Sequence, residues 1–221
     1  MKINHIRKWP MLAATTLALS TMTLATHADP GFIDFGARAG FELGTGVPAN
    51  DMVVVGVFSH YKLKNGLLLG GAIDLADYDF ERAAKVMGIT QDEVANSTID
   101  AKTSVKNISF WLENRNQINL SPSEWYWRAG LGVGLVDADD LAGPVLGGGT
   151  FNITTDGGTE FLALAGLGYR YKFGDKWTLD SYLGITEHFA DWKLTDTVST
   201  TTGSVGNYGT ASLLIGLDHS F

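Results

Sequence analysis

The sequence contains no cysteine among its 221 residues, and it carries little positive charge. A chain without cysteine cannot be a disulfide scaffold, so it must depend on an ordinary core or on a closed sheet. Sixteen Lys and Arg against 24 Asp and Glu give a formal net charge of −8. This balance argues against a nucleic-acid partner, which would need clustered basic residues. Beyond the first thirty residues the sequence also lacks any apolar run of about eighteen residues, which argues against membrane-spanning helices.

The first 28 residues have the order of a secretory signal peptide. Lys2, Arg7 and Lys8 give a basic start, residues 11–25 are mostly apolar, and Thr26-His27-Ala28 ends on a small residue. This order predicts cleavage after Ala28 and export of residues 29–221. An amphipathic anchor helix is the alternative interpretation of the same segment.

Residues 29–221 contain eight segments in which apolar and polar side chains alternate. A period of two is typical of a strand with one apolar and one polar face. Each segment supplies roughly the 9–11 residues that a tilted strand needs to cross a bilayer. The predicted strands are Gly31–Leu43, Met52–Lys62, Leu67–Tyr78, Ser104–Leu120, Trp125–Val136, Glu160–Lys172, Trp177–His188 and Ser212–Phe221.

The connections between these segments alternate in length. Residues 64–66, 121–124 and 173–176 contain Asn-Gly, Pro or Gly-Asp, which are typical of tight turns. With eight antiparallel strands, both ends of the chain fall on the side of these short turns. The pattern predicts an all-β fold, an eight-stranded antiparallel up-and-down transmembrane β-barrel with short periplasmic turns and long extracellular loops. The long connections are about 44–51, 79–103, 137–158 and 190–206.

Alternation alone does not say which face lies outside, and a soluble lipocalin-like carrier would turn its apolar face inward. Three features favour the membrane orientation. The polar face carries most of the strand glycines, as suits a crowded lumen. Its charges have both signs and can pair across that lumen: Asp34, Arg38, Glu42, Asp74, Glu113, Arg115, Arg128, Glu160, Arg170, Asp180 and Asp218. Aromatic residues gather near the short turns, where they predict an interfacial girdle: Tyr61, Trp125, Trp127, Tyr169, Tyr171, Trp177 and Phe221.

The last strand alternates Leu213, Ile215 and Leu217 and ends on Phe221. This ending resembles the carboxy-terminal signature of bacterial outer-membrane β-barrels. The chain as a whole is similar to the small eight-stranded class, the opacity-like and outer-membrane-protein-A-like barrels. The resemblance implies a Gram-negative outer-membrane location, contact with outer-membrane lipid and lipopolysaccharide, and recognition of the ending by the barrel assembly machinery. His219 departs from the signature, because an aromatic or aliphatic residue is more usual there.

The second long connection has helical features of its own. Glu81–Met87 reads as a helix-like run, Gly88 stands at a plausible C-terminal cap, and Thr90-Gln91-Asp92-Glu93 fits a capping box. These features predict a partly helical external cap that is available to a partner. A solvated loop with residual helix is the alternative.

We expect no catalytic residues, no cofactor and no metal site. A lipid-modifying enzyme would need a nucleophile, a His and an acid near the outer rim. Glu187 and His188 lie there, but adjacent strand residues point to opposite faces. Residues 137–140 (Asp-Ala-Asp-Asp) could attract a divalent cation among lipopolysaccharide phosphates, yet they have no EF-hand pattern, and a solvated acidic loop is the simpler interpretation.

The leading functional expectation is a non-enzymatic outer-membrane scaffold that presents extracellular loops for structural or surface-interaction roles, with the surface partner unspecified. The first alternative is a narrow pore of low conductance, because eight strands leave a lumen that side chains such as Arg38, Arg128 and Glu113 can plug. An outer-membrane lipid-modifying enzyme and a soluble periplasmic lipocalin-like carrier are the other two.

Overall fold

The computed structural model describes residues 31–44, 52–63, 67–79, 102–118, 121–138, 140–144, 150–155 and 157–221. The predicted signal peptide, the turn at 64–66 and the helix-like segment of residues 81–97 lie outside these ranges, so the three predictions remain predictions.

Among the described residues, no helix is both long enough and apolar enough to span a membrane.

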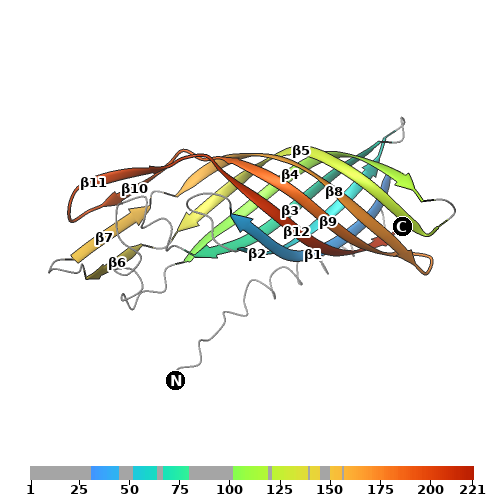
Figure 1. Ribbon diagram of the computed structural model, residues 1–221, viewed down its shortest axis with the longest axis horizontal. Helices are drawn as coiled ribbons and strands as arrows, with labels where there is room; N and C mark the ends of the chain where they lie inside the picture. The colour runs from blue at the N-terminus through green and yellow to red at the C-terminus, as the bar shows by residue number, and fades with distance from the viewer. Residues whose placement is uncertain are drawn as a thin grey trace, which may run out of the picture.

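Eight strands form a closed barrel in the order β1-β12-β9-β8-β5-β4-β3-β2 (Figure 1). The first and last strands pair antiparallel, from Asp34 opposite Ser220 to Gly44 opposite Thr210, so the sheet has no free edge. The predicted up-and-down barrel is confirmed, and several strands extend beyond the alternating segments. The barrel strands are β1 (Phe32–Gly44), β2 (Met52–Lys62), β3 (Leu68–Asp79), β4 (Lys102–Gln117), β5 (Ser123–Ala138), β8 (Gly158–Phe173), β9 (Trp177–Phe189) and β12 (Tyr208–Ser220).

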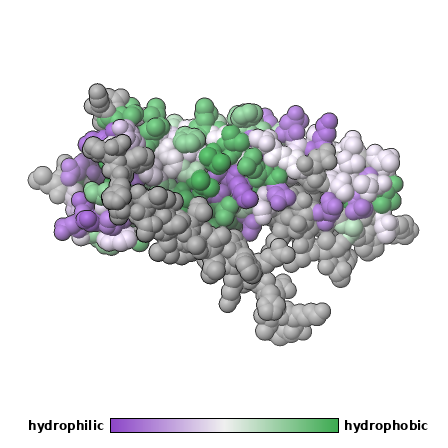
Figure 2. Space-filling view, turned by 180° about the vertical axis from the view of Figure 1, so that it is seen from behind, coloured by the Kyte–Doolittle hydropathy of each residue, from purple (hydrophilic) through white to green (hydrophobic). Residues whose placement is uncertain are grey.

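In the barrel wall, apolar side chains are exposed and charged side chains are buried, which is the opposite of the arrangement in a soluble protein. Large apolar side chains of the outer face are exposed, with Leu131 at 70% and Phe161 at 66%, whereas the charged Glu113 is fully buried in the interior. Figure 2 shows apolar residues gathered over the barrel wall and polar residues towards both ends. Because an apolar surface of this extent is stable against lipid and not against water, the apolar face is the membrane face. The soluble lipocalin-like alternative is wrong.

The short turns lie at the end of the barrel that also holds the C terminus (Figure 1). Gly174 lies between β8 and β9 with a φ of 70°, a backbone conformation that favours glycine. The β4–β5 turn is closed by the Ser121 N–H, which donates to the Ile118 carbonyl at 2.8 Å. At the same end the Ser220 N–H donates to the carbonyl of Lys176 at 2.7 Å. These contacts give a compact periplasmic rim.

Two of the long extracellular connections are hairpins rather than plain loops. The additional strands β6 (Leu141–Pro144), β7 (Thr150–Thr155), β10 (Trp192–Asp196) and β11 (Thr201–Val205) form a four-stranded sheet in the order β11-β10-β7-β6. The two hairpins join where β10 pairs with β7. This outer sheet projects beyond the barrel, opposite the C terminus (Figure 1). The sequence pattern indicated only long connections there.

Candidate functional site in the barrel lumen

All eleven charged residues that the alternation placed on the lumen face point into the barrel: the ten of the predicted polar network, and Glu42. Nine of the ten side chains are at most 9% exposed, and Arg115 is 14% exposed. Alternation positions them there, because every second residue of a strand faces the lumen. The ten are Asp34, Arg38, Asp74, Glu113, Arg115, Arg128, Glu160, Arg170, Asp180 and Asp218.

A charged layer lies in the periplasmic half of the lumen. The His60 ring lies between two carboxylates, with Nδ1 2.6 Å from Asp34 Oδ1 and Nε2 3.3 Å from Glu113 Oε2. Arg115 Nε donates to Glu113 Oε1 at 2.6 Å. Arg170 Nη2 donates to Asp218 at 2.9 Å and to Asp34 at 3.3 Å. The layer therefore links five strands, β1, β2, β4, β8 and β12, through buried ion pairs.

Arg128 sits in an aromatic cage at the middle of the lumen. Its guanidinium carbon lies 4.7 Å from the ring centroids of Trp111 and Tyr126 and 4.2 Å from that of Tyr182. The two tyrosine rings are parallel, with centroids 6.5 Å apart. Arg128 Nη2 also donates to the Tyr126 hydroxyl at 2.5 Å, and that hydroxyl donates to Asp180 at 2.6 Å. Cation–π contacts and hydrogen bonds together compensate the desolvation of the guanidinium group.

The aromatic cage was not part of the predicted network. The spacing along each strand could have revealed it, because Trp111 stands two residues before Glu113 and Tyr126 stands two residues before Arg128. Residues at that spacing share a strand face, so the rings had to point inward with the charges.

A second buried cluster lies near the extracellular rim. His188 Nδ1 is 3.5 Å from Glu160 Oε2, and its Nε2 is 3.3 Å from Thr210 Oγ1. The ring stacks on Tyr208, whose hydroxyl donates to Glu160 at 3.0 Å. A hydroxyl, an imidazole and a carboxylate in this order resemble a nucleophile with its base. Thr210, however, is only 2% exposed, so a substrate cannot reach its hydroxyl in this arrangement. Glu187, the acid considered in the sequence, is exposed on the outer face.

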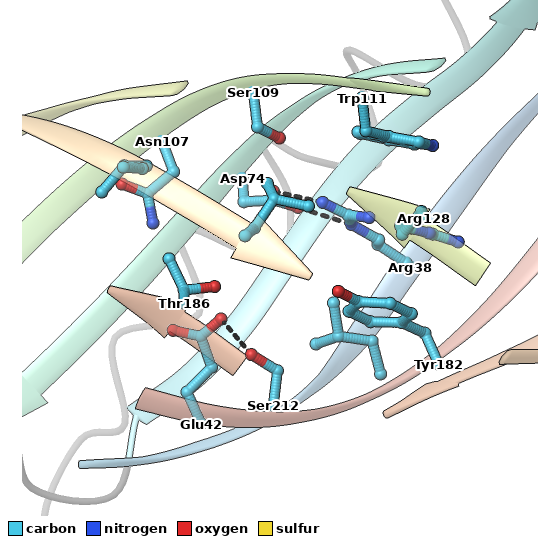
Figure 3. Close-up of a pocket in the computed structure, with 13 residues that line it drawn as sticks. Arg38, Glu42, Asp74, Asn107, Ser109, Trp111, Arg128, Tyr182, Thr186 and Ser212 are labelled. Carbon is cyan, nitrogen blue, oxygen red and sulfur yellow. Dashed lines mark hydrogen bonds and ion pairs between the residues drawn. The ribbon is translucent and has the colours of Figure 1, made fainter. Parts of the chain in front are cut away.

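Two cavities flank the charged middle of the lumen. The upper cavity, of about 40 Å³, lies in the extracellular half and is drawn in Figure 3. The lower cavity, of about 300 Å³, lies at the periplasmic end between Arg115, Arg170, Lys172 and Glu124. Arg128 lines the upper cavity and Arg170 the lower one, and the ion pairs of Glu113 and Asp180 lie between them.

The predicted girdle residues are exposed on the outer face near the periplasmic end. Across the sheet Trp125 stands opposite Tyr169. The His219 ring contacts Trp177 at 5.0 Å and Phe221 at 5.8 Å between centroids. The histidine that departs from the terminal signature is thus one of the rings at this level. The girdle residues Tyr61, Trp125, Trp127, Tyr169, Tyr171 and Trp177 are 38–46% exposed, and the ending residues Leu213, Ile215, Leu217 and Phe221 are 41–55% exposed.

Exposed phenylalanines mark the opposite end of the wall. Phe161 stands opposite Phe189, and Phe41 is exposed near the outer end of β1. Sequence reasoning missed this group, although Phe41 and Phe161 fall on the apolar face near the outer ends of alternating segments and Phe189 directly follows such a segment.

Only part of the acidic run 137–140 lies within the described ranges. Asp137 and Asp140 are exposed, and Asp139 lies outside the described ranges. Within the described ranges no group of three or more His, Cys, Asp or Glu residues could hold a metal ion.

Comparison with protein-family models gives no match, and comparison with curated proteins gives none either. Among solved structures, the chain is similar to a major outer membrane protein from Thermus thermophilus. That likeness has 10% identity and a TM-score of 0.54, and it covers 87% of this chain and 100% of that one.

Two further solved structures are similar at lower scores. Neisserial surface protein A matches at 14% identity with a TM-score of 0.49, over 86% of this chain and 96% of that one. Ail, the attachment invasion locus protein of Yersinia pestis, matches at 13% identity with a TM-score of 0.43, over 86% and 97%. The closed eight-stranded barrel, its apolar wall and its likeness to the Thermus protein together show that the chain has the fold of the small eight-stranded bacterial outer-membrane β-barrels.

Proposed function

We propose that the protein is exported to the outer membrane by its signal peptide and serves there as a non-enzymatic anchor for the outer sheet. The observation that carries this proposal is the pairing of β10 with β7, which joins two extracellular hairpins into one ordered surface. A sheet held on a closed barrel keeps its geometry, which is what a surface-interaction site requires.

The chemistry of the outer sheet favours a polar partner. The β10–β11 hairpin exposes Lys193, Ser199, Thr200, Thr202 and Ser204. The hydroxyl groups can donate and accept hydrogen bonds with polysaccharide or with the backbone of another protein, and the Lys193 ammonium group can donate them. The outer sheet therefore suits a hydrated surface partner better than a lipid one.

The filled lumen supports an anchor rather than a channel. Buried ion pairs and an aromatic cage occupy its middle, as expected for a barrel of eight strands. The two cavities are the feature that favours the narrow-pore alternative, because only the charged middle separates them. Planar-bilayer recordings test it, and we expect no steady conductance from the unmodified protein.

The anchor proposal is tested by trimming the outer sheet. Residues 193–204 are replaced by an Asn-Gly turn, which shortens the β10–β11 hairpin and leaves the barrel strands intact. The trimmed protein should still shift in mobility on a detergent gel between unheated and boiled samples. Adhesion of cells to polysaccharide-coated and protein-coated surfaces should fall to the level of cells that lack the protein.

A matched control is Lys176→Gln in the periplasmic turn, which removes a charge at the other end of the barrel and should leave adhesion unchanged. Equal adhesion by trimmed and intact proteins would refute a role for the outer sheet. A difference in lipid A mass between cells with and without the protein would instead favour a lipid-modifying enzyme.

A further inference from the structure

The upper lumen cavity is lined by buried oxygen atoms that lack partners. Glu42 Oε1 accepts a hydrogen bond from Ser212 at 2.9 Å, but Glu42 Oε2 has no hydrogen-bond partner, and neither does Asn107 Oδ1. The two residues are 7% and 8% exposed. Buried polar atoms are almost always satisfied by protein, water or an ion. Figure 3 shows Glu42, Thr186 and Asn107 along one side of this cavity.

Glu42 also lacks an ion-pair partner among the described residues. Within the described part of the chain, no Lys, Arg or His forms an ion pair with its carboxylate. Arg38 lines the same cavity, but its guanidinium donates to both oxygens of Asp74, at 2.8 and 2.5 Å. Arg128 lines it too and is held in the aromatic cage. A carboxylate buried without a partner is costly, and either a proton or a bound cation removes that cost.

The charge balance of the buried ion-pair network leads to the same conclusion. Together with Glu42, the network contains seven carboxylates against four arginines and two histidines. Even with both histidines protonated, the carboxylates exceed the cations by one. The acids are Asp34, Glu42, Asp74, Glu113, Glu160, Asp180 and Asp218, and the bases are Arg38, Arg115, Arg128, Arg170, His60 and His188.

We propose that the upper cavity is a binding site for one small monovalent inorganic cation, such as Na⁺ or K⁺. Glu42 Oε2 supplies the charge, and the amide oxygen of Asn107 and the Ser109 and Thr186 hydroxyls supply neutral oxygens. A volume of about 40 Å³ has room for the ion and about two waters. A single carboxylate among neutral oxygens suits a monovalent ion, because calcium sites collect six to eight oxygens and usually several carboxylates. The ion would cross-link β1, β4 and β9 inside the barrel.

Crystals soaked in thallium(I) nitrate test the site directly, because Tl⁺ has the charge of K⁺ and scatters anomalously. We expect an anomalous peak in the upper cavity in contact with Glu42. Glu42→Gln keeps the shape and removes the charge, and it should abolish the peak. Glu124→Gln, at the lower cavity, is the matched control and should retain it. An empty cavity in the unmodified protein would overturn the proposal, and so would an undiminished peak in Glu42→Gln.

Thermal unfolding in detergent gives a second measurement that does not need crystals. NaCl or KCl is exchanged for choline chloride at constant ionic strength, since choline is too large for the cavity. The unfolding midpoint should rise with the inorganic cation and depend on its concentration, as binding to the folded state requires. The midpoint of Glu42→Gln should not respond. An equal response of both proteins would show that Glu42 holds only a proton or water. If Glu42→Gln does not fold, Asn107→Leu should weaken the response instead.

Discussion

At the scale of single residues, three glycines decide how the lumen is filled. A methyl group at Gly168 would collide with the ring of Tyr126, one at Gly70 with Trp111, and one at Gly184 with Tyr182. The glycines thus give the aromatic rings around Arg128 the space that they occupy. The glycine-rich polar face of the strands is a packing surface for these rings.

Substitution of Gly168 by Ala should therefore destabilise the barrel. The added methyl group forces Tyr126 out of its position, and overpacking of this kind costs about 1–3 kcal/mol. Urea unfolding in lipid vesicles, followed by tryptophan fluorescence, measures the change. Gly206→Ala is the control, because no atom lies within 4 Å of a methyl group there. Similar losses at both positions would contradict the packing role of Gly168.

Neutralisation of Arg128 should weaken the middle of the lumen. Arg128→Gln leaves Glu113 and Asp180 with one cation fewer, and removal of one partner from a buried charge network typically costs about 3–5 kcal/mol. With the guanidinium gone, planar-bilayer recordings should show a measurable conductance where the unmodified protein shows none. Arg115→Gln, at the rim of the lower cavity, should have the smaller effect on conductance. No change in either stability or conductance with Arg128→Gln would contradict the plugged lumen.

Sequence reasoning could place these residues on a face but could not pair them. The inward direction of Asp34, Glu113 and Arg170 follows from a period of two. The position of His60 between Asp34 and Glu113 does not, because these partners come from three strands whose relative stagger is fixed only when the barrel closes. The unpartnered oxygen of Glu42 could not be foreseen for the same reason.

At the scale of elements, the outer sheet depends on a carboxylate that links its two hairpins. Asp196, in β10, accepts hydrogen bonds from the backbone N–H groups of Asn152 at 3.0 Å, Val198 at 3.1 Å and Ser199 at 3.2 Å. Hydrogen bonding to the Ser199 side chain, and then these backbone bonds, lower the pKa of Asp196 to about 2 from its usual 3.8. The charged form is therefore the one that the folded hairpins favour.

This lowered pKa predicts how the outer sheet responds to acid. A group whose pKa falls on folding contributes stability above its unfolded value, and that contribution is lost as the pH falls through the folded value. The contribution of Asp196 should be full above about pH 4 and disappear near pH 2. Hydrogen exchange of the Asn152 and Val198 amides measures it.

At neutral pH Asp196→Asn should raise the exchange rate of these amides, corresponding to about 1 kcal/mol for a weakened hydrogen bond. The difference from the unmodified protein should vanish near pH 2. Asp175→Asn, in a periplasmic turn, should not affect these amides at any pH. A difference that persists unchanged at about pH 2 would exclude the carboxylate as its cause.

The eight barrel strands were predictable because each carries its own signal of alternation, whereas the outer strands were not. β6 (Leu-Ala-Gly-Pro) is four residues long and contains Gly and Pro, and β11 (Thr-Thr-Gly-Ser-Val) is five residues long and rich in Thr, Gly and Ser, so the composition of both is typical of loops. The outer sheet forms through pairing between distant segments, such as Asp196 of β10 with Ile153 of β7, and no local pattern reports such a contact.

At the scale of the whole molecule, the outer and inner faces of the barrel wall differ sharply in polarity. An apolar exterior, aromatic residues near both rims and a charged, filled interior fit a barrel that lies in lipid and holds the outer sheet on the extracellular side. Under the proposed function, the lumen contributes stability and closure, and the outer sheet makes the contact with the surroundings.

The alternation of faces along β12 in lipid is the measurement that tests this account most directly. Because the chain has no cysteine, single cysteines can be placed at Leu213, Leu214 and Ile215 and spin-labelled. Leu213 and Ile215 are 53% and 55% exposed, and Leu214 is 4% exposed. In vesicles, labels at 213 and 215 should be relaxed strongly by oxygen, which dissolves in lipid, and the label at 214 should be reached poorly by oxygen and by a polar reagent. Contact of position 214 with lipid, or equal access of the polar reagent to all three, would contradict the account.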